Sequence, residues 1–107
     1  MEKVITIILG ILSVILFSIS LMHMYEKGYL LNNAYIYASK EERENMNKRP
    51  YYRQSGIVFF LLGLIALLNA FNIELKSVGL FVFVILLIVL VIVYAIVSTK
   101  KIEKNNR

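Results

Sequence analysis

The sequence contains no cysteine and only one histidine. Without cysteine the chain forms no disulfide bond, iron–sulfur cluster or thiolate metal site, and it has no cysteine nucleophile. A single histidine cannot build a zinc site alone, because such sites take three or four protein ligands. We therefore expect no metal and no other cofactor.

Charge is scarce along most of the chain, whereas apolar residues are abundant. They make up 59% of the 107 residues and the mean hydropathy is +0.71, above the roughly 45–50% apolar share of soluble domains. The net charge of +5 does not indicate nucleic-acid binding, because no soluble segment approaches the size of a domain. We expect a lipid bilayer as the environment, no nucleic-acid partner and no identified small-molecule substrate.

Three apolar segments predict three transmembrane helices. Residues 78–97 and 4–22 are uncharged and long enough to cross a hydrocarbon core of roughly 30 Å at about 1.5 Å per residue. The middle run, 57–71, is shorter, but Pro50 suits the first turn of a helix that continues into it. The run over 4–22 is longer than the apolar core of a signal peptide, and the leader has Glu2 beside Lys3 instead of a basic cluster. Both features favour an uncleaved first span over a signal peptide.

The predicted fold is an all-α membrane protein with three transmembrane helices and a short cytoplasmic helical connector between the first and second. We expect one membrane domain over 1–107, with spans at about 4–24, 53–72 and 78–98, a loop over 25–52 and a tail over 99–107. Ser77 is expected to cap the third helix.

Basic residues predict the orientation of the chain. The loop together with Arg53, which directly follows it, holds six and the tail four, ten in all, against Lys3 and Lys76 on the opposite side. Since lysine and arginine are enriched in cytoplasmic segments, the N-terminus is expected outside and the C-terminus inside the bacterial cell membrane. Aromatic rings near the inner ends of the spans are expected to act as interfacial anchors; they are Tyr25, Tyr29, Tyr51, Tyr52 and Tyr94.

Small residues recur on one stripe of each of the first two spans. Such stripes let helix backbones approach closely, either within one chain, which we favour, or against a partner or second copy. The packing residues predicted in this way are Gly10, Ser13, Gly56, Gly63, Ala66 and Ala70. The third span has few small residues and is expected to face more lipid.

The loop between the first two spans contains two predicted helical pieces. Ser39 and Glu42 have the spacing of a capping box, followed by a helix over about 40–47. Before it, apolar residues over 30–38 share one helical face, which predicts a segment lying along the inner membrane surface. We favour an ordinary connector, and the alternative is a docking surface for lipid or a partner formed by Tyr35, Glu41, Glu42 and Arg43.

The same loop carries a resemblance to a known family. It is similar to the bacterial domain-of-unknown-function family 3784, whose members have three spans and a first loop with Lys-Gly-Tyr, a small residue and Tyr, then Ser-Lys-Glu-Glu. The matching positions are Lys27, Gly28, Tyr29, Ala34, Tyr35, Ser39, Lys40, Glu41 and Glu42, with Arg53 and Gly56 opening the second span. Asn32 and Asn33 depart from the usual apolar or small residues. The resemblance implies the topology and a bacterial origin, and it supplies no activity.

Ionisable groups inside a membrane mark transport and proton relays, and no Asp, Glu, Lys, Arg or His lies within the apolar runs 4–22, 57–71 and 78–97. His23, at the inner end of the first span, is interpreted as a histidine without a role, with pH sensing as the alternative. No paired acid and base is evident, so we expect no enzyme.

The preferred function is a non-catalytic accessory or regulatory protein that binds a membrane partner or forms a homo-oligomer. The alternative is an immunity protein against a membrane-active peptide or secreted toxin.

Overall fold

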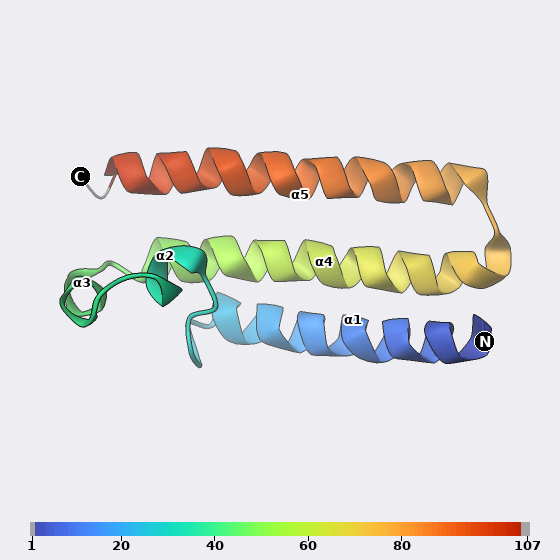
Figure 1. The fold of residues 1–107 in the computed structure, drawn as a ribbon, viewed down its shortest axis with the longest axis horizontal. Helices are drawn as coiled ribbons and strands as arrows, with labels where there is room; N and C mark the ends of the chain where they lie inside the picture. Colours follow the sequence, from blue (N-terminus) through green and yellow to red (C-terminus); the bar gives the residue numbers. More distant parts are fainter. Residues whose placement is uncertain (1, 106–107) are drawn as a thin grey trace.

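The computed structural model describes residues 2–105, and it consists of three long helices and two short ones. The helices are α1 (Glu2–Met24), α2 (Asn33–Ile36), α3 (Lys40–Asn45), α4 (Arg49–Leu75) and α5 (Val78–Asn105). In Figure 1, α4 lies between α1 and α5, and α2 and α3 lie at one end of the bundle. We call the residues between α1 and α4, 25–48, the connector, and that end the connector end.

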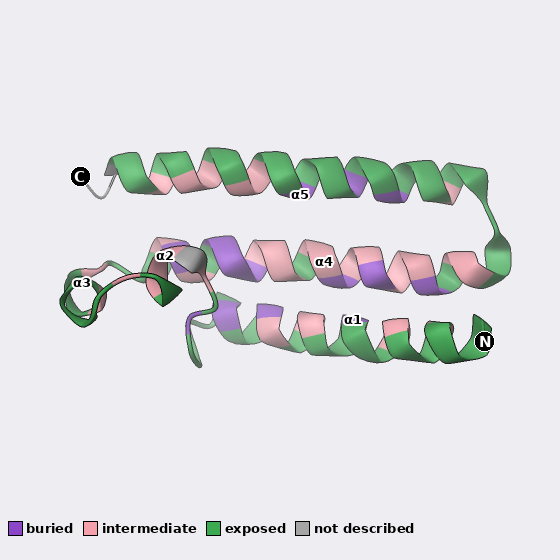
Figure 2. Cartoon of the chain, viewed as in Figure 1, coloured by how far each residue is buried: buried purple, intermediate pink, exposed green. Residues whose placement is uncertain are grey.

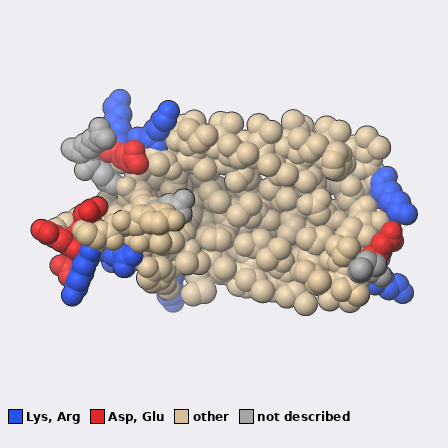
Figure 3. All heavy atoms as spheres, viewed as in Figure 1, with Lys and Arg blue, Asp and Glu red and all other residues tan. Residues whose placement is uncertain are grey.

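All three long helices are long and apolar enough to cross a membrane. The described residues contain no β-strand, so the predicted all-α, three-span fold with a short helix in the connector is confirmed. Charged side chains gather at the two ends of the bundle, and the face shown in Figure 3 has an uncharged belt between them. The longest dimension, 48 Å, leaves room for a hydrocarbon core of roughly 30 Å and charged ends in the headgroup layers.

The turn between α4 and α5 consists of two residues. Lys76 has a left-handed backbone (φ 50°, ψ 40°) and its N–H donates to the Asn72 carbonyl over 2.8 Å. Ser77 Oγ accepts from Leu80 N–H over 3.2 Å, which confirms Ser77 as the cap of α5. The sequence predicts that the second span ends at about residue 72, but α4 continues to Leu75. The Asn72 side chain accepts from Ser77 N–H over 2.8 Å and so closes the end of the longer helix.

Helices α1 and α4 approach closely along the predicted stripe of small residues. Ser20 Oγ donates to the Gly56 carbonyl across the interface over 2.6 Å. A Cβ atom at Gly56 would lie 2.7 Å from Met24 Sδ, and one at Gly63 would lie 3.0 Å from the Phe17 ring. Of the predicted packing residues, those buried in the structure are Ser13, Gly56, Gly63, Ala66 and Ala70.

Gly10 differs from the predicted role. A Cβ atom at this position would meet nothing within 4 Å, so Gly10 makes no close helix contact. Ser13, three residues further along the stripe, is buried, and its hydroxyl donates to the Gly10 carbonyl over 2.7 Å. Gly10 lies nearer the end where α1 is more exposed (Figure 2).

Helix α5 contacts α4 along one narrow face. Val84, Leu87 and Val91 are buried there, at spacings of three and four residues. Most of its other large apolar side chains are exposed in the isolated chain. In a membrane these side chains face lipid or another protein, because exposed apolar surface of this extent is unfavourable in water.

The connector folds back onto the bundle, and the prediction of a continuous helical segment over 30–38 is wrong. Only the four residues of α2 are helical there, and Leu30 is 1% exposed. The reason is that the backbone of this region bonds to side chains of α1 and α4, as described below. Further on, Ser39 Oγ accepts from Glu42 N–H over 3.1 Å, so the predicted cap of α3 is confirmed, although α3 ends at Asn45.

Candidate functional site

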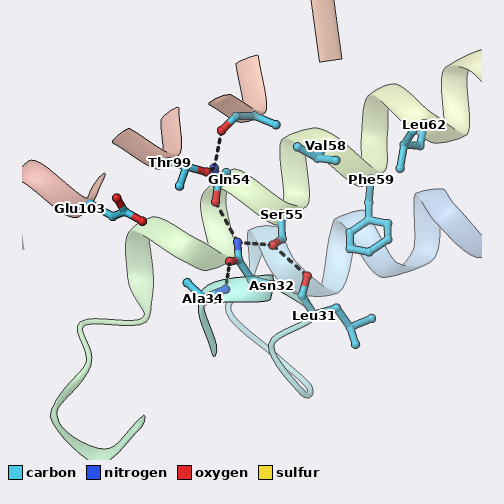
Figure 4. A pocket seen from close by; sticks show the side chains of 11 residues that line it. Leu31, Asn32, Ala34, Gln54, Ser55, Val58, Phe59, Leu62, Thr99 and Glu103 are labelled. Atoms are coloured by element: carbon cyan, nitrogen blue, oxygen red, sulfur yellow. Dashed lines mark hydrogen bonds between the residues drawn. The ribbon is translucent and has the colours of Figure 1, made fainter. Parts of the chain in front are cut away.

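Five polar side chains meet at the connector end between the connector, α4 and α5. We call them the amide cluster; they are Asn32, Gln54, Ser55, Ser98 and Thr99. Asn32 comes from the connector, Gln54 and Ser55 from the second turn of α4, and Ser98 and Thr99 from α5. Figure 4 shows all of them except Ser98. Gln54 and Ser55 are buried. Polar side chains at such depth require partners, because an unmade hydrogen bond there costs free energy.

The amide cluster satisfies its own donors and acceptors. Asn32 Nδ2 donates to Gln54 Oε1 over 2.8 Å and to Ser55 Oγ over 2.9 Å. Gln54 Nε2 in turn lies 2.7 Å from Ser98 Oγ and 2.8 Å from Thr99 Oγ1. Among the described residues, no buried side-chain nitrogen or oxygen lacks a partner. The cluster therefore joins three segments of chain by hydrogen bonds that are complete without a ligand.

His23 fastens the connector to α1. Its Nδ1 lies 3.0 Å from the Ile19 carbonyl, and its Nε2 accepts from Leu31 N–H over 3.0 Å. These two partners fit only a neutral imidazole that carries its proton on Nδ1. The ring is 2% exposed and lies edge-on to Tyr52, with centroids 5.4 Å apart. The interpretation of His23 as a histidine without a role is thus wrong, because it holds the connector.

Two further bonds complete the attachment of the connector to α4. Ser55 Oγ donates to the Leu31 carbonyl over 3.0 Å, and the Tyr52 hydroxyl donates to the Gly28 carbonyl over 2.6 Å. Gly28 has φ +81°, a conformation that other residues adopt at a cost. Hydrogen bonds at Gly28, Leu31 and Asn32 therefore hold the connector against α1 and α4.

A cavity of about 490 Å³ adjoins the amide cluster. It opens between the connector, α4 and α5, and Figure 4 shows the side chains that line it. Besides the cluster, the lining is mainly apolar, with Val58, Phe59 and Leu62 from α4, and Glu103 contributes the one carboxylate among the lining residues. The side chains of Asn32, Gln54, Ser55 and Thr99 in the wall take part in hydrogen bonds, so apart from Glu103 the cavity offers chiefly apolar contact.

A second pocket, of about 250 Å³, lies between the end of α1 and the beginning of α4. We call it the basic pocket; it is lined by His23, Met24, Glu26, Arg49 and Arg53. Arg49 Nε and Glu26 Oε1 are 3.1 Å apart and form an exposed ion pair. Within the described residues Arg53 forms no ion pair, so the pocket keeps one guanidinium that no acid neutralises.

The predicted interfacial anchors separate into exposed and buried rings. Tyr25 and Tyr29 are exposed, and Tyr52 and Tyr94 are half-buried. Tyr51 is only 6% exposed, so it packs inside the protein and does not present its ring to the interface. Tyr51 and Tyr52 are adjacent on α4 and point about 100° apart, which places them in different surroundings.

Two of the four residues predicted to dock a partner are used inside the connector. Arg43 donates from Nε to the Tyr35 carbonyl over 2.9 Å, and its guanidinium carbon lies 4.7 Å from the centre of the Tyr35 ring. Tyr35 and Arg43 therefore stabilise the connector itself. Glu41 and Glu42 are exposed on α3, and so is Tyr37 before it, at 84%.

The chain matches one known protein family over nearly its whole length. The family model described as Domain of unknown function (DUF3784) matches residues 4–103, nearly the whole chain. The chain belongs to this family. No curated protein and no solved structure matches the chain. In this DUF3784 protein the matched region includes the connector, all of α4, all but the outermost residues of α1 and α5, and both pockets.

Reasoning from the sequence did not find the amide cluster. The sequence gives Gln54 no role beyond membership of the second predicted span, and it marks Asn32 only as a departure from the family pattern. The sequence does contain one indication of the cluster. Gln54 lies at the start of the second span and Ser98 and Thr99 at the end of the third, so in two adjacent antiparallel helices their polar side chains are expected at the same depth in the membrane. The position of Asn32 could not be deduced in this way, since it depends on how the connector folds.

Proposed function

We propose that the protein is a non-catalytic accessory or regulatory membrane protein that binds a membrane partner. The observation that carries the proposal is the attachment of the connector to the bundle through His23, Ser55 and the amide cluster. The polar groups inside the bundle are engaged in holding the chain together, as expected of a scaffold. A connector fixed in this way presents a defined surface outside the membrane, at a constant position relative to the spans.

The proposed location is the bacterial cell membrane, with the N-terminus outside and the connector and C-terminal end inside. Nine described lysine and arginine residues belong to the connector, the first turns of α4 and the last turns of α5, against Lys3 and Lys76 at the opposite end. Such an asymmetry sets orientation through the positive-inside rule. Reporter fusions after Glu44 and after Leu75 test it, and an exterior signal from the first would contradict the orientation.

The proposed partner surface combines the exposed part of the connector with lipid-facing apolar side chains. Tyr37, Glu41 and Glu42 project from the connector, and aromatic residues of this kind are enriched in protein interfaces. The side of α5 that faces away from α4 exposes large apolar side chains as well, and these would supply the part of the partner contact that lies within the membrane. A membrane protein with its own cytosolic part can contact both regions at once.

Site-specific photocrosslinking in native membranes tests this proposal. A photoreactive residue at Tyr37 is expected to give one discrete adduct with a membrane protein, whereas the same residue at the exposed position Lys3, at the opposite end, serves as the control. Asn32→Ala is expected to weaken the Tyr37 adduct, because it releases the connector without changing Tyr37. If Tyr37 gives no adduct, or the same diffuse adducts as Lys3, the accessory function is wrong.

The immunity function makes a different prediction in the same cells. Deletion of the gene would sensitise the cells to a secreted peptide or toxin, and crosslinks to that peptide would form from the outer ends of the spans. The two functions are therefore distinguished by which end of the protein, Lys3 or Tyr37, contacts a specific partner.

A further inference from the structure

The basic pocket, between the end of α1 and the beginning of α4, has the chemistry of a phosphate site. Arg49 and Arg53 are four residues apart on α4, so their Cβ atoms lie about 5–6 Å apart on one face. Guanidinium groups bind phosphate oxygens through paired N–H donors. We propose that this pocket binds the headgroup phosphate of an anionic phospholipid.

The position of the pocket in the bundle favours a lipid over a soluble phosphate. The two arginines belong to the first two turns of α4, at the connector end of the bundle, and charged side chains at the ends of the bundle border an uncharged belt (Figure 3). Met24, which lines the pocket, is exposed, and Phe60, seven residues after Arg53 on the same face of α4, is 50% exposed. Below the phosphate position there is thus apolar surface against which an acyl chain packs, as in basic pockets between spans that bind lipid headgroups.

Charge in the pocket favours an anionic over a zwitterionic lipid. Glu26 pairs with Arg49 at 3.1 Å, but Arg53 has no acidic partner in the described part of the chain. The phosphate of either lipid adds the missing negative charge next to Arg53, but the choline of a zwitterionic lipid also brings a third cation beside the two guanidiniums. Glu26 acts as a competitor, because its carboxylate occupies the Arg49 donors that a phosphate would use.

The test measures lipid binding by native mass spectrometry of the full chain in neutral detergent. The purified protein is titrated with phosphatidylglycerol, with phosphatidylcholine and with glycerol phosphate, which has the phosphate without acyl chains. We expect Arg53→Gln and Arg49→Gln each to weaken phosphatidylglycerol binding by about tenfold or more, since each removes charge-assisted hydrogen bonds to the phosphate. Phosphatidylcholine and glycerol phosphate are expected to bind at least about tenfold more weakly than phosphatidylglycerol.

Matched variants separate a pocket from general surface charge. Lys101→Gln removes one positive charge at the same end of the bundle but outside the pocket and is expected to leave binding unchanged. Glu26→Gln is expected to tighten binding, because it removes the competitor, whereas a merely structural role of the Arg49–Glu26 pair predicts weaker binding. Arg53→Lys keeps the charge and the fold, and is expected to fall between the native protein and Arg53→Gln.

Three results would overturn the proposal. Equal losses for Arg53→Gln and Lys101→Gln would show that diffuse charge attracts the lipid. Weaker binding in Glu26→Gln would show that the ion pair supports the fold instead of competing with phosphate. Glycerol phosphate that binds as tightly as phosphatidylglycerol would assign the pocket to a soluble phosphate. None of these results depends on whether a protein partner exists.

Discussion

The side chains of Asn32 and Gln54 meet end to end, with Asn32 Nδ2 2.8 Å from Gln54 Oε1. The two residues come from different segments, the connector and α4, and Gln54 also reaches Ser98 and Thr99 on α5. One pair of amides thereby links the connector to both later spans. In lipid, where apolar contacts between helices have little driving force, such bonds contribute to how the segments are held together.

Substitution of Asn32 tests this relationship. Asn32→Ala leaves Gln54 Oε1 without its donor, and we expect the free energy of unfolding to fall by about 1–3 kcal/mol. The measurement is unfolding in detergent micelles followed by circular dichroism. Asn45→Ala is the matched control, since Asn45 is an exposed amide that bonds only the Glu41 carbonyl.

A double-mutant cycle with Gln54→Ala measures the pair itself. Because the two side chains are in contact, we expect a coupling energy of about 0.5–2 kcal/mol between Asn32→Ala and Gln54→Ala. Additive losses would show that the two amides do not interact in the folded protein.

The contrast between Gly63 and Gly10 gives a second prediction. A methyl group at Gly63 would lie 3.0 Å from the Phe17 ring, which also packs against Phe60 with centroids 5.5 Å apart. Gly63→Ala should therefore destabilise the fold by about 1–3 kcal/mol through overpacking. Gly10→Ala meets open space, and we expect the free energy of unfolding to stay the same or rise by less than about 1 kcal/mol.

The same assay distinguishes overpacking from other causes. Phe17→Leu replaces the ring by a smaller branched side chain. We expect it to recover much of the stability lost in Gly63→Ala. A Gly63→Ala protein as stable as Gly10→Ala would mean that α1 and α4 are not in contact at this level of the bundle.

The backbone of Gly28 gives a third prediction. Its φ of +81° places it in the left-handed region, and a Cβ atom there would lie 2.8 Å from Met22 Cε. Gly28→Ala is expected to cost about 1 kcal/mol or more and to loosen the connector. Gly79→Ala is the control, because the nearest atom to its Cβ, Ser77 Oγ, is 3.7 Å away. Hydrogen exchange of the connector amides measures the effect, and equal protection in the two variants would contradict it.

The spans and helix caps were predictable from the sequence because they depend on neighbouring residues. Residues 78–97 form a helix because an uncharged run of that length inserts into lipid whatever else the chain does. Ser39 and Ser77 cap helices through bonds to residues three positions away. The packing stripe was visible as well, because small residues at helical spacing mark a close contact, although Gly10 shows that the stripe extends further than the contact does.

The connector was not predictable because its structure depends on distant partners. The pattern of Leu30, Leu31 and Ala34 matches an amphipathic helix, but His23 and Ser55 bind the backbone of Leu31 and stop a helix from forming there. A local pattern contains no information about hydrogen-bond partners eight or twenty-four positions away. For the same reason, Tyr51 was read as an interfacial ring although tertiary packing buries it.

The attachment of the connector leads to a fourth prediction, which the absence of cysteine makes simple to test. Leu30 is 1% exposed and Tyr37 is 84% exposed, so a thiol introduced by Leu30→Cys should react with a water-soluble maleimide much more slowly than one introduced by Tyr37→Cys. His23→Phe removes the acceptor of the Leu31 N–H, which costs about 1–3 kcal/mol, and it should therefore speed labelling in the Leu30→Cys background roughly tenfold. In the Tyr37→Cys background the same change should have no effect, because that position is already open. Equal labelling rates for Leu30→Cys and Tyr37→Cys with His23 intact would mean that the connector leaves the bundle in the membrane, and the fixed surface on which the proposed partner binding depends would not exist.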